Sequence, residues 1–203
     1  MHKHANLPAA FAELGLETPV LRALVKAGFV EPSEIQKAMI PEVLAGKDVL
    51  GQARTGTGKT AAFGLPILQG ISLEKGLQAL VVVPTRELAV QVAAEIRRLA
   101  DSTGFHIVPI YGGQKIKHQL HLLGKKPHII VGTPGRILDL LDRRELNFND
   151  VRIAVLDEVD RMLDIGFRDD IRNILSRIEQ EHQTVFVSAT LTDDIKRLAK
   201  QYR

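Results

Sequence analysis

The sequence predicts an α/β domain with a central, mostly parallel sheet that helices cover on both faces. From residue 47 onward, short runs rich in Val, Ile and Leu alternate with longer amphipathic segments. Nearly continuous apolar runs are typical of strands whose two faces are both buried by helices. A polar or glycine-containing segment also follows each of the six apolar runs. Because ligands of open α/β sheets bind beyond the carboxyl ends of the strands, this placement predicts a functional edge.

Helices are expected before the sheet begins. Thr18 and Pro19 begin one helix, because proline is favoured in a first helical turn, and Gly28 follows its end. Ser33 begins a second helix, which Gly46 closes.

The sheet elements then follow in strict alternation along the chain. The apolar runs predict strands at 48–51, 79–83, 106–110, 128–131, 152–156 and 184–188. The segments between and after them predict helices at 59–70, 86–100, 114–123, 134–142, 167–179 and 192–201. Parallel strands joined through helices require crossovers, which we expect to be right-handed.

Length and composition indicate one globular domain. The chain has 203 residues, of which 45% are hydrophobic and 25% charged, and it contains no cysteine, which excludes disulfides and thiolate zinc sites. No apolar run is long enough for a membrane span, so we expect no membrane partner and a cytoplasmic location. The net charge of +3 predicts that any nucleic acid binds at local sites. We expect a monomer.

A glycine-rich loop joins the first predicted strand to the helix at 59–70. Such a loop turns several backbone N–H groups toward one point at a helix N-terminus, where an anion is favoured. Its end adds the Lys59 ammonium for the β- and γ-phosphates of a nucleotide and the Thr60 hydroxyl for Mg²⁺. The alternative is a plain turn with a surface lysine. The predicted phosphate site comprises Ala53, Arg54, Thr55, Gly56, Thr57, Gly58, Lys59 and Thr60.

Two carboxylates directly follow the strand predicted at 152–156. Asp157 occupies the usual place of a second carboxylate that positions Mg²⁺, largely through water. Glu158 could orient or activate an attacking water. With Lys59 they form the predicted catalytic group, and Thr60 with Asp157 forms the predicted metal site. The alternative is a helix N-cap in which both residues favour the helix dipole.

Two further groups of polar residues follow the other strands. One offers hydroxyls, guanidinium groups, exposed backbone N–H groups and helix N-termini, an inventory that suits the phosphates of a nucleic-acid strand: Thr85, Arg86, Gly112, Gly113, Thr133 and Arg136. Turn glycines and helix caps are the alternative. In the other group, Ser188 and Thr190 offer hydroxyls that could bond Asp160 and relay the nucleotide state. His118 and His121 are interpreted as a solvated helix face rather than a metal site.

In this order, the motifs resemble those of the N-terminal, RecA-like half of a DEAD-box RNA helicase of superfamily 2, from about Phe11 to Tyr202. The matching pieces are the loop with alanine at its first position, Pro84-Thr85-Arg86-Glu87-Leu88, Gly112-Gly113, Thr133-Pro134-Gly135-Arg136, Asp157-Glu158-x-Asp160 and Ser188-Ala189-Thr190. The resemblance implies ATP and Mg²⁺ as cofactors and RNA as a partner. It implies sequence-independent RNA contacts by Pro84, Thr85, Arg86, Gly112, Gly113, Thr133, Pro134, Gly135 and Arg136.

An upstream segment resembles the family's Q motif. It contains Gly28-Phe29, Pro32-Ser33 and Ile35-Gln36, and Phe11 precedes Gly28 by 17 residues. The resemblance implies that Phe11 stacks on adenine, that Gln36 bonds the adenine edge, and that Phe29 and Ser33 complete the nucleotide site. The alternative is that Gln36 is an exposed helix residue and Phe11 a core residue.

One residue departs from the family pattern. Val159 stands where the family name has alanine, although the three acidic positions of that motif are intact. The extra methyl groups must fit locally, and they put the coupling to residues 188–190 in question.

We expect residues 1–203 to form a single RecA-like domain, with the Q motif region at about 9–37 and the P-loop core at about 46–203. The chain ends where the family's linker to a second RecA-like domain begins. The resemblance implies that ATP and RNA close the two domains of the intact protein, that short duplexes separate, and that hydrolysis releases the RNA. Alternatives are an ATP-gated RNA clamp, a DNA helicase of the same superfamily and a metabolic P-loop kinase.

Overall fold

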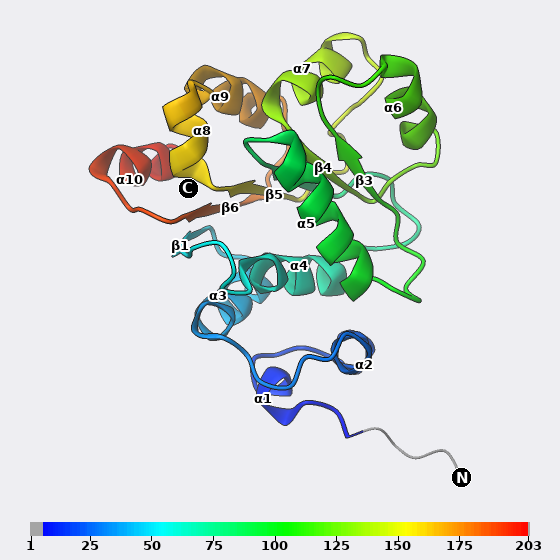
Figure 1. Cartoon of the computed structure of the whole chain (residues 1–203), viewed down its shortest axis with the longest axis vertical. Coiled ribbons are helices and arrows are strands. Elements are labelled where there is room, and N and C mark those ends of the chain that lie inside the picture. Colours follow the sequence, from blue (N-terminus) through cyan, green and yellow to red (C-terminus); the bar gives the residue numbers. More distant parts are fainter. Residues whose placement is uncertain (1–5, 203) are drawn as a thin grey trace.

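Six parallel strands form one twisted sheet with helices on both faces (Figure 1). The computed structural model describes residues 6–202. The strands are β1 (Val49–Gln52), β2 (Ala79–Val82), β3 (Ile107–Ile110), β4 (Ile129–Gly132), β5 (Ile153–Asp157) and β6 (Gln183–Ser188). Their order across the sheet is β1-β6-β5-β2-β4-β3, and every neighbouring pair is parallel. The α/β prediction is therefore confirmed, with a sheet that is wholly rather than mostly parallel.

Ten helices surround the strands in the described part of the chain. They are α1 (Ala9–Ala12), α2 (Thr18–Lys26), α3 (Glu34–Leu44), α4 (Lys59–Gly70), α5 (Arg86–Leu99), α6 (Ile116–Leu123), α7 (Pro134–Asp142), α8 (Val159–Ile165), α9 (Arg168–Ser176) and α10 (Asp193–Lys200). All six predicted strands and the predicted helices form within a few residues of the expected bounds. Within residues 6–202, no helix is long and apolar enough to span a membrane.

The sequence prediction missed α8. None of the predicted helices covers residues 159–165, although the alternative interpretation of Asp157 and Glu158 as a helix N-cap implies a helix there. In the structure the backbone of Glu158 adopts a left-handed conformation (φ 57°, ψ 52°), so the chain turns from β5 into α8 within one residue. Gly166, also left-handed, ends α8 and separates it from α9.

Alternating strand residues enter two separate cores, one on each face of the sheet. Val81 and Val155 pack with residues of α2 to α5, whereas Leu80 and Phe186 pack with residues of α7 to α10. Both faces are thus apolar, which explains why the strands read as nearly continuous hydrophobic runs. The carboxyl ends of all six strands meet at one edge, where polar loops emerge (Figure 1).

Two strand glycines differ in their tolerance of a side chain. A Cβ on Gly132, the last residue of β4, would lie 2.8 Å from Ile137 Cγ1 and 3.0 Å from the backbone oxygen of Ile110. A Cβ on Gly51 in β1 would meet only the flexible Met39 side chain, whose sulfur lies 2.8 Å away. Backbone cannot withdraw without disturbing the β3–β4 pairing, whereas a methionine changes rotamer readily.

We therefore expect Gly132→Ala to lower the free energy of unfolding by about 1–3 kcal/mol, the usual cost of overpacking. Gly51→Ala should cost clearly less, and it serves as the matched control. Urea unfolding of both variants measures the difference. Equal destabilisation by the two substitutions would contradict this account of the β3–β4 edge.

Candidate nucleotide and nucleic-acid site

The strand order divides the predicted site residues into two groups at the carboxyl edge. The adjacent strands β1, β6 and β5 lead into the glycine-rich loop, residues 189–192 and Asp157-Glu158. The adjacent strands β2, β4 and β3 lead into the segments that begin at Pro84, Thr133 and Tyr111. Motifs that alternate along the chain are therefore sorted in space into a nucleotide half and a nucleic-acid half.

The glycine-rich loop between β1 and α4 has the geometry that phosphate binding needs. Gly56 and Gly58 have φ values of +84° and +80°, a region that residues with a side chain rarely adopt. The Thr57 hydroxyl donates a hydrogen bond to the Arg54 carbonyl (2.6 Å) and closes the turn. A Cβ on Gly58 would lie 2.5 Å from Gln36 Nε2, so a side chain there would displace the Gln36 amide from its contact with the loop. Residues 54–58 remain exposed, which leaves their backbone groups open to a ligand.

A cleft of about 820 Å³ opens between the start of α3 and this loop. Its volume is within the range of small-molecule sites. Its walls include Ser33, Ile35, Ala53, Arg54, Thr57 and Ala189. A separate cavity of about 560 Å³, between α2 and the ends of α4 and α5, contains none of the predicted site residues.

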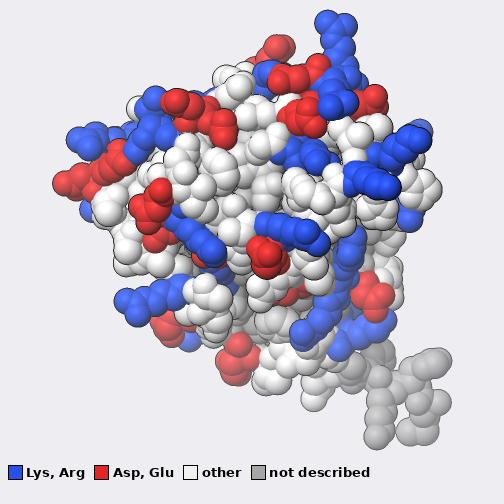
Figure 2. Space-filling model, turned by 45° about the horizontal axis from the view of Figure 1, so that its top comes forward, with Lys and Arg blue, Asp and Glu red and all other residues white. Residues whose placement is uncertain are grey.

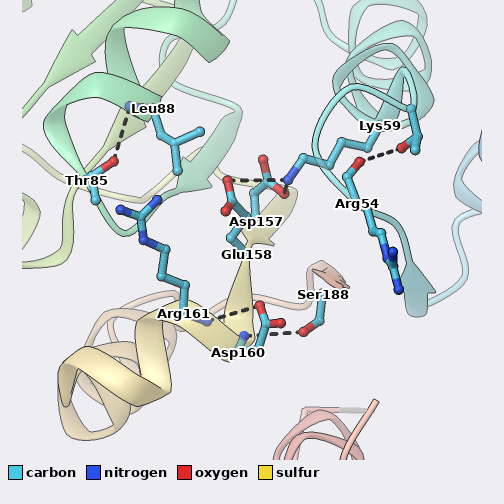
Figure 3. Close-up of polar contacts among 10 residues, drawn as sticks. Arg54, Lys59, Thr85, Leu88, Asp157, Glu158, Asp160, Arg161 and Ser188 are labelled. Carbon is cyan, nitrogen blue, oxygen red and sulfur yellow. Dashed lines mark hydrogen bonds and ion pairs between the residues drawn. The ribbon is translucent and has the colours of Figure 1, made fainter. Parts of the chain in front are cut away.

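The Lys59 ammonium lies between two carboxylates (Figure 3). Its Nζ is 3.0 Å from Asp157 Oδ1 and 3.4 Å from Glu158 Oε2. The side chains of Lys59 and Asp157 are 7% and 0% exposed. Burial raises the pKa of the Asp157 carboxyl, and although Lys59 opposes this rise, the neighbouring Glu158 charge adds to it. The structure thus brings together the three predicted catalytic residues.

The residues predicted to hold Mg²⁺ fit that ion. Asp157 Oδ2 is buried and has no hydrogen-bond partner among residues 6–202, and Oδ1 pairs with Lys59. Thr60 lies in the first turn of α4 and is likewise buried. Oxygen donors of this kind suit Mg²⁺, which commonly takes one or two protein ligands and completes its shell with phosphate and water. No group of three His, Asp or Glu residues in the described chain forms a ready-made metal cluster.

The left-handed backbone of Glu158 positions the acidic motif. A non-glycine residue in this conformation costs on the order of 1–3 kcal/mol and persists only where its surroundings require it. The turn buries the following Val159 completely among the apolar residues of the second core. The extra methyl groups of valine, in question from the sequence, are thus accommodated.

The residues predicted to relay the nucleotide state are in contact. The backbone N–H of Asp160 donates to Ser188 Oγ (3.3 Å), and Thr190 Oγ1 donates to Asp160 Oδ2 (3.1 Å). The Ser188 carbonyl accepts from the N–H of Ala53 (3.0 Å). Residues 188–190 therefore touch both the glycine-rich loop and the acidic motif, and Figure 3 shows the contact of Ser188 with Asp160.

Gln36 is not the exposed helix residue of the alternative interpretation. Its side chain is buried: Oε1 accepts from the Ser33 N–H (2.9 Å) in a capping box, and Nε2 donates to the Gly58 carbonyl (3.0 Å). The predicted Q motif thus contacts the phosphate loop directly.

Phe11 lies deeper than its predicted role requires. Its ring has no exposed surface and packs edge-on against Phe29, with ring centroids 6.2 Å apart and an interplanar angle of 77°. Stacking of Phe11 on adenine would need an exposed ring, which this conformation does not provide. The position of Phe11 therefore matches the alternative interpretation, in which it is a core residue. Phe29 is the half-buried ring of the pair.

In the nucleic-acid half, several predicted residues have structural roles as well. Thr85 caps α5 by accepting from the Leu88 N–H (3.3 Å, Figure 3), and Pro84 and Pro134 are buried. Gly112, Gly113 and Gly135 are exposed, as backbone contacts require. Thr133 precedes α7, and its side chain makes no capping bond. The alternative interpretation of these threonines as helix caps therefore holds for the side chain of Thr85 and not for that of Thr133.

Arg86 and Arg136, the two arginines predicted to bind RNA, differ in exposure and in hydrogen bonding. Arg86 is exposed, with its guanidinium carbon 5.2 Å from the centre of the Tyr111 ring. The Arg136 side chain is only 13% exposed and bonds Gln119 Oε1 (2.9 Å) and the Gln114 carbonyl (3.1 Å). Arg136 is therefore held by the protein rather than free at the surface.

The sequence interpretation missed Tyr111, Gln114 and Gln119. They belong to none of the recognised motifs, and their roles arise from tertiary contacts. Gln119 is the one buried polar residue of α6, whose other polar side chains are exposed. His118 and His121 are exposed on α6, as expected for a solvated face. Figure 2 shows basic and acidic side chains interspersed on the visible face, which agrees with recognition at local sites.

Comparisons with known proteins agree with this geometry. The DEAD/DEAH box helicase family model matches residues 33–198. The chain is 49% identical over 193 residues to a DEAD-box ATP-dependent RNA helicase CshA of Bacillus cereus and 51% identical to one of Streptococcus pneumoniae serotype 4. Each alignment covers 95% of this chain, and the chain spans only 37% of each relative.

Solved structures with the same fold include a DEAD box protein from the hyperthermophile Methanococcus jannaschii, with a TM-score of 0.90 and 42% identity over 95% of this chain and 53% of that one. A hypothetical ATP-dependent RNA helicase from Sulfolobus tokodaii gives a TM-score of 0.83 and 38% identity over 90% of this chain and 54% of that one. The glycine-rich loop, the acidic motif and the segment that resembles the Q motif lie together at the carboxyl edge of this fold. Together with the match to the family model, they show that the chain belongs to the DEAD/DEAH box helicase family.

Proposed function

We propose that this chain is the ATP-binding half of an ATP-dependent RNA helicase. It binds ATP with Mg²⁺ and the RNA backbone and, together with a second RecA-like domain, hydrolyses ATP to unwind or remodel short RNA duplexes. The observation that carries the proposal is the division of one sheet edge into a nucleotide half and a nucleic-acid half. The curated relatives named above support it, since their names describe ATP-dependent RNA helicases.

ATP binding requires Lys59 to change partners. Its ammonium is now neutralised by Asp157 and Glu158, and the phosphates of ATP would take their place. Thr60 and Asp157 would hold Mg²⁺, which would neutralise charge on the phosphate oxygens. The carboxylate of Glu158, released from Lys59, would then be free to orient the attacking water.

Adenine recognition rests on Gln36 and Phe29. An amide group has two N–H donors and two acceptor lone pairs, and Gln36 uses one of each within the protein. The remaining donor and lone pair can bond the adenine edge. Phe29 has exposed surface and Phe11 has none, so we assign stacking to Phe29 and support of that ring to Phe11.

RNA binding in this proposal depends on phosphate and sugar contacts. Arg86, Gly112, Gly113, Gly135 and Thr133 lie at the ends of three adjacent strands, where guanidinium, backbone N–H and hydroxyl groups are available. Such groups fix the position of a strand without reading its bases. Release of a labelled strand from a short RNA duplex by the intact protein tests this function, and ATP-dependent binding without release would identify a clamp.

The isolated chain is expected to bind adenine nucleotide weakly and to hydrolyse ATP very slowly. In related phosphoryl-transfer systems, an arginine supplied from another domain or protein contributes about 10³–10⁵ in rate. Calorimetric nucleotide titration and a phosphate-release assay with and without RNA measure this, with Lys59→Ala as the inactive control. RNA-stimulated turnover by residues 1–203 alone, at the rate of a complete helicase, would refute the need for a second domain.

Gln36→Ala in the intact protein is expected to raise the KM for ATP about tenfold or more, because a good bidentate contact to a base contributes about 1–3 kcal/mol. It should also reduce the preference for ATP over GTP. Steady-state kinetics with both nucleotides measure the effect. The matched control is Gln91→Ala, on the exposed face of α5. Unchanged nucleotide selectivity in the Gln36 variant would remove the adenine assignment.

Asp157→Asn is expected to retain or increase stability while Mg²⁺–ATP affinity falls about 10–100-fold. Because burial raises the pKa of Asp157, the ionised carboxylate is less favourable in the folded than in the unfolded protein. The folded protein carries this cost near neutral pH, and the cost disappears as the pH falls through the raised pKa. The neutral amide removes the cost at every pH.

Thermal unfolding and ATP titration with and without Mg²⁺ measure both effects of this substitution. Asp164→Asn, at an exposed position of α8, is the control. A Tm several degrees below that of the parent protein, or an unaltered dependence on Mg²⁺, would show that this account of Asp157 is wrong.

A further inference from the structure

A buried glutamine lies beneath the nucleic-acid half of the site. Gln119 of α6 has no exposed surface, and both ends of its amide are bonded. Its Nε2 donates to the backbone carbonyl of Tyr111 (2.6 Å), and its Oε1 accepts from Arg136 Nη1 (2.9 Å). An amide side chain supplies a donor to the carbonyl and an acceptor to the guanidinium at the same time.

The contacts continue from Gln119 to every loop of this half. Arg136 Nη2 donates to the Gln114 carbonyl (3.1 Å), and Gln114 Nε2 donates to the Tyr111 hydroxyl (2.7 Å). The guanidinium of Arg86 lies over the Tyr111 ring. One contiguous set of contacts therefore joins the segments that follow β2, β3 and β4, and Gln119 is its most buried member.

We propose that Gln119 is a positioning residue of the RNA site. Through Tyr111 and Arg136 it fixes the three loops in one arrangement, so RNA affinity depends on a side chain that does not touch RNA. This inference rests on the proposed RNA binding. An arginine already fixed in place loses less rotamer freedom when a phosphate binds, and pre-organisation of this kind increases affinity.

Arg136 keeps N–H donors for an RNA phosphate while it is bonded to Gln119 and Gln114. A guanidinium has five N–H donors, and the bonds to Gln119 and Gln114 occupy two of them. The remaining donors lie on a side chain that is 13% exposed. Gln119 and the Gln114 carbonyl thus take one donor each from Nη1 and Nη2, and Asp139 Oδ2 lies 3.9 Å from Nε. The second donors of Nη1 and Nη2 remain for a phosphate.

Gln119→Met in the full-length protein tests the inference, because methionine keeps the length of the side chain and removes both hydrogen bonds. Fluorescence anisotropy with a labelled single-stranded oligouridine, over a range of salt concentrations, measures RNA affinity. We expect RNA affinity to fall about tenfold and ATP affinity without RNA to stay within twofold. The control is Gln91→Met, on the exposed face of α5, which should bind RNA as the parent does.

A merely structural role would give a different pattern. If Gln119 acts through Arg136, Arg136→Gln alone should weaken RNA binding, and adding Gln119→Met should weaken it little further. Full additivity of the two substitutions, or unchanged RNA affinity in Gln119→Met, would overturn the inference. Lower ATP affinity in proportion to lower RNA affinity would overturn it too, because it would indicate general loss of structure.

Arg136→Lys provides a second test that does not depend on the folding of a Gln119 variant. Lysine keeps the charge but cannot bond Gln119 and Gln114 in the same fixed fork. We expect about tenfold weaker RNA binding, and affinity equal to that of the parent would overturn the inference. Absence of RNA binding by the parent protein would refute the proposed function itself, and this inference with it.

Discussion

A buried ammonium between two carboxylates is the interaction on which the nucleotide half depends. Lys59 begins α4, and Asp157 and Glu158 end β5 and begin the turn into α8, so one ion contact joins the phosphate loop to the strand at the centre of the sheet. Burial disfavours the ionised Asp157 carboxylate more than the attraction of Lys59 favours it, as the raised pKa of Asp157 indicates. The arrangement is therefore suited to exchange of partners, because a polyanionic ligand and a cation can satisfy all three charges together.

The strand order explains how one domain can serve two ligands. β5 and β2 are neighbours in register, from Ala79 opposite Ile153 to Val82 opposite Leu156, and they form the boundary between the two halves. The acidic motif lies at the end of one of these strands and the segment of Thr85 and Arg86 at the end of the other. The nucleotide half and the nucleic-acid half thus meet at a single pair of hydrogen-bonded strands, β5 and β2.

Much of this architecture follows from local sequence patterns, and the failures have physical reasons. The strands and the loop at 53–60 were predictable because apolar periodicity and glycine requirements are local properties. Helix α8 was missed because it has only seven residues and begins directly after a left-handed Glu158. The position of Phe11 and the contacts of Gln119 were not predictable, since side chains distant in sequence determine which ring is covered and which amide is buried.

The backbone conformation of Glu158 also sets the energetic cost of a side chain at this position. Glycine adopts φ near +57° without strain, so the local backbone by itself favours the loss of this side chain. A glutamate at this position therefore has a less favourable backbone conformation than a glycine would have. The left-handed turn thus holds the carboxylate beside Lys59 at a cost in backbone energy, so the proposed site explains this side chain better than the stability of the turn does.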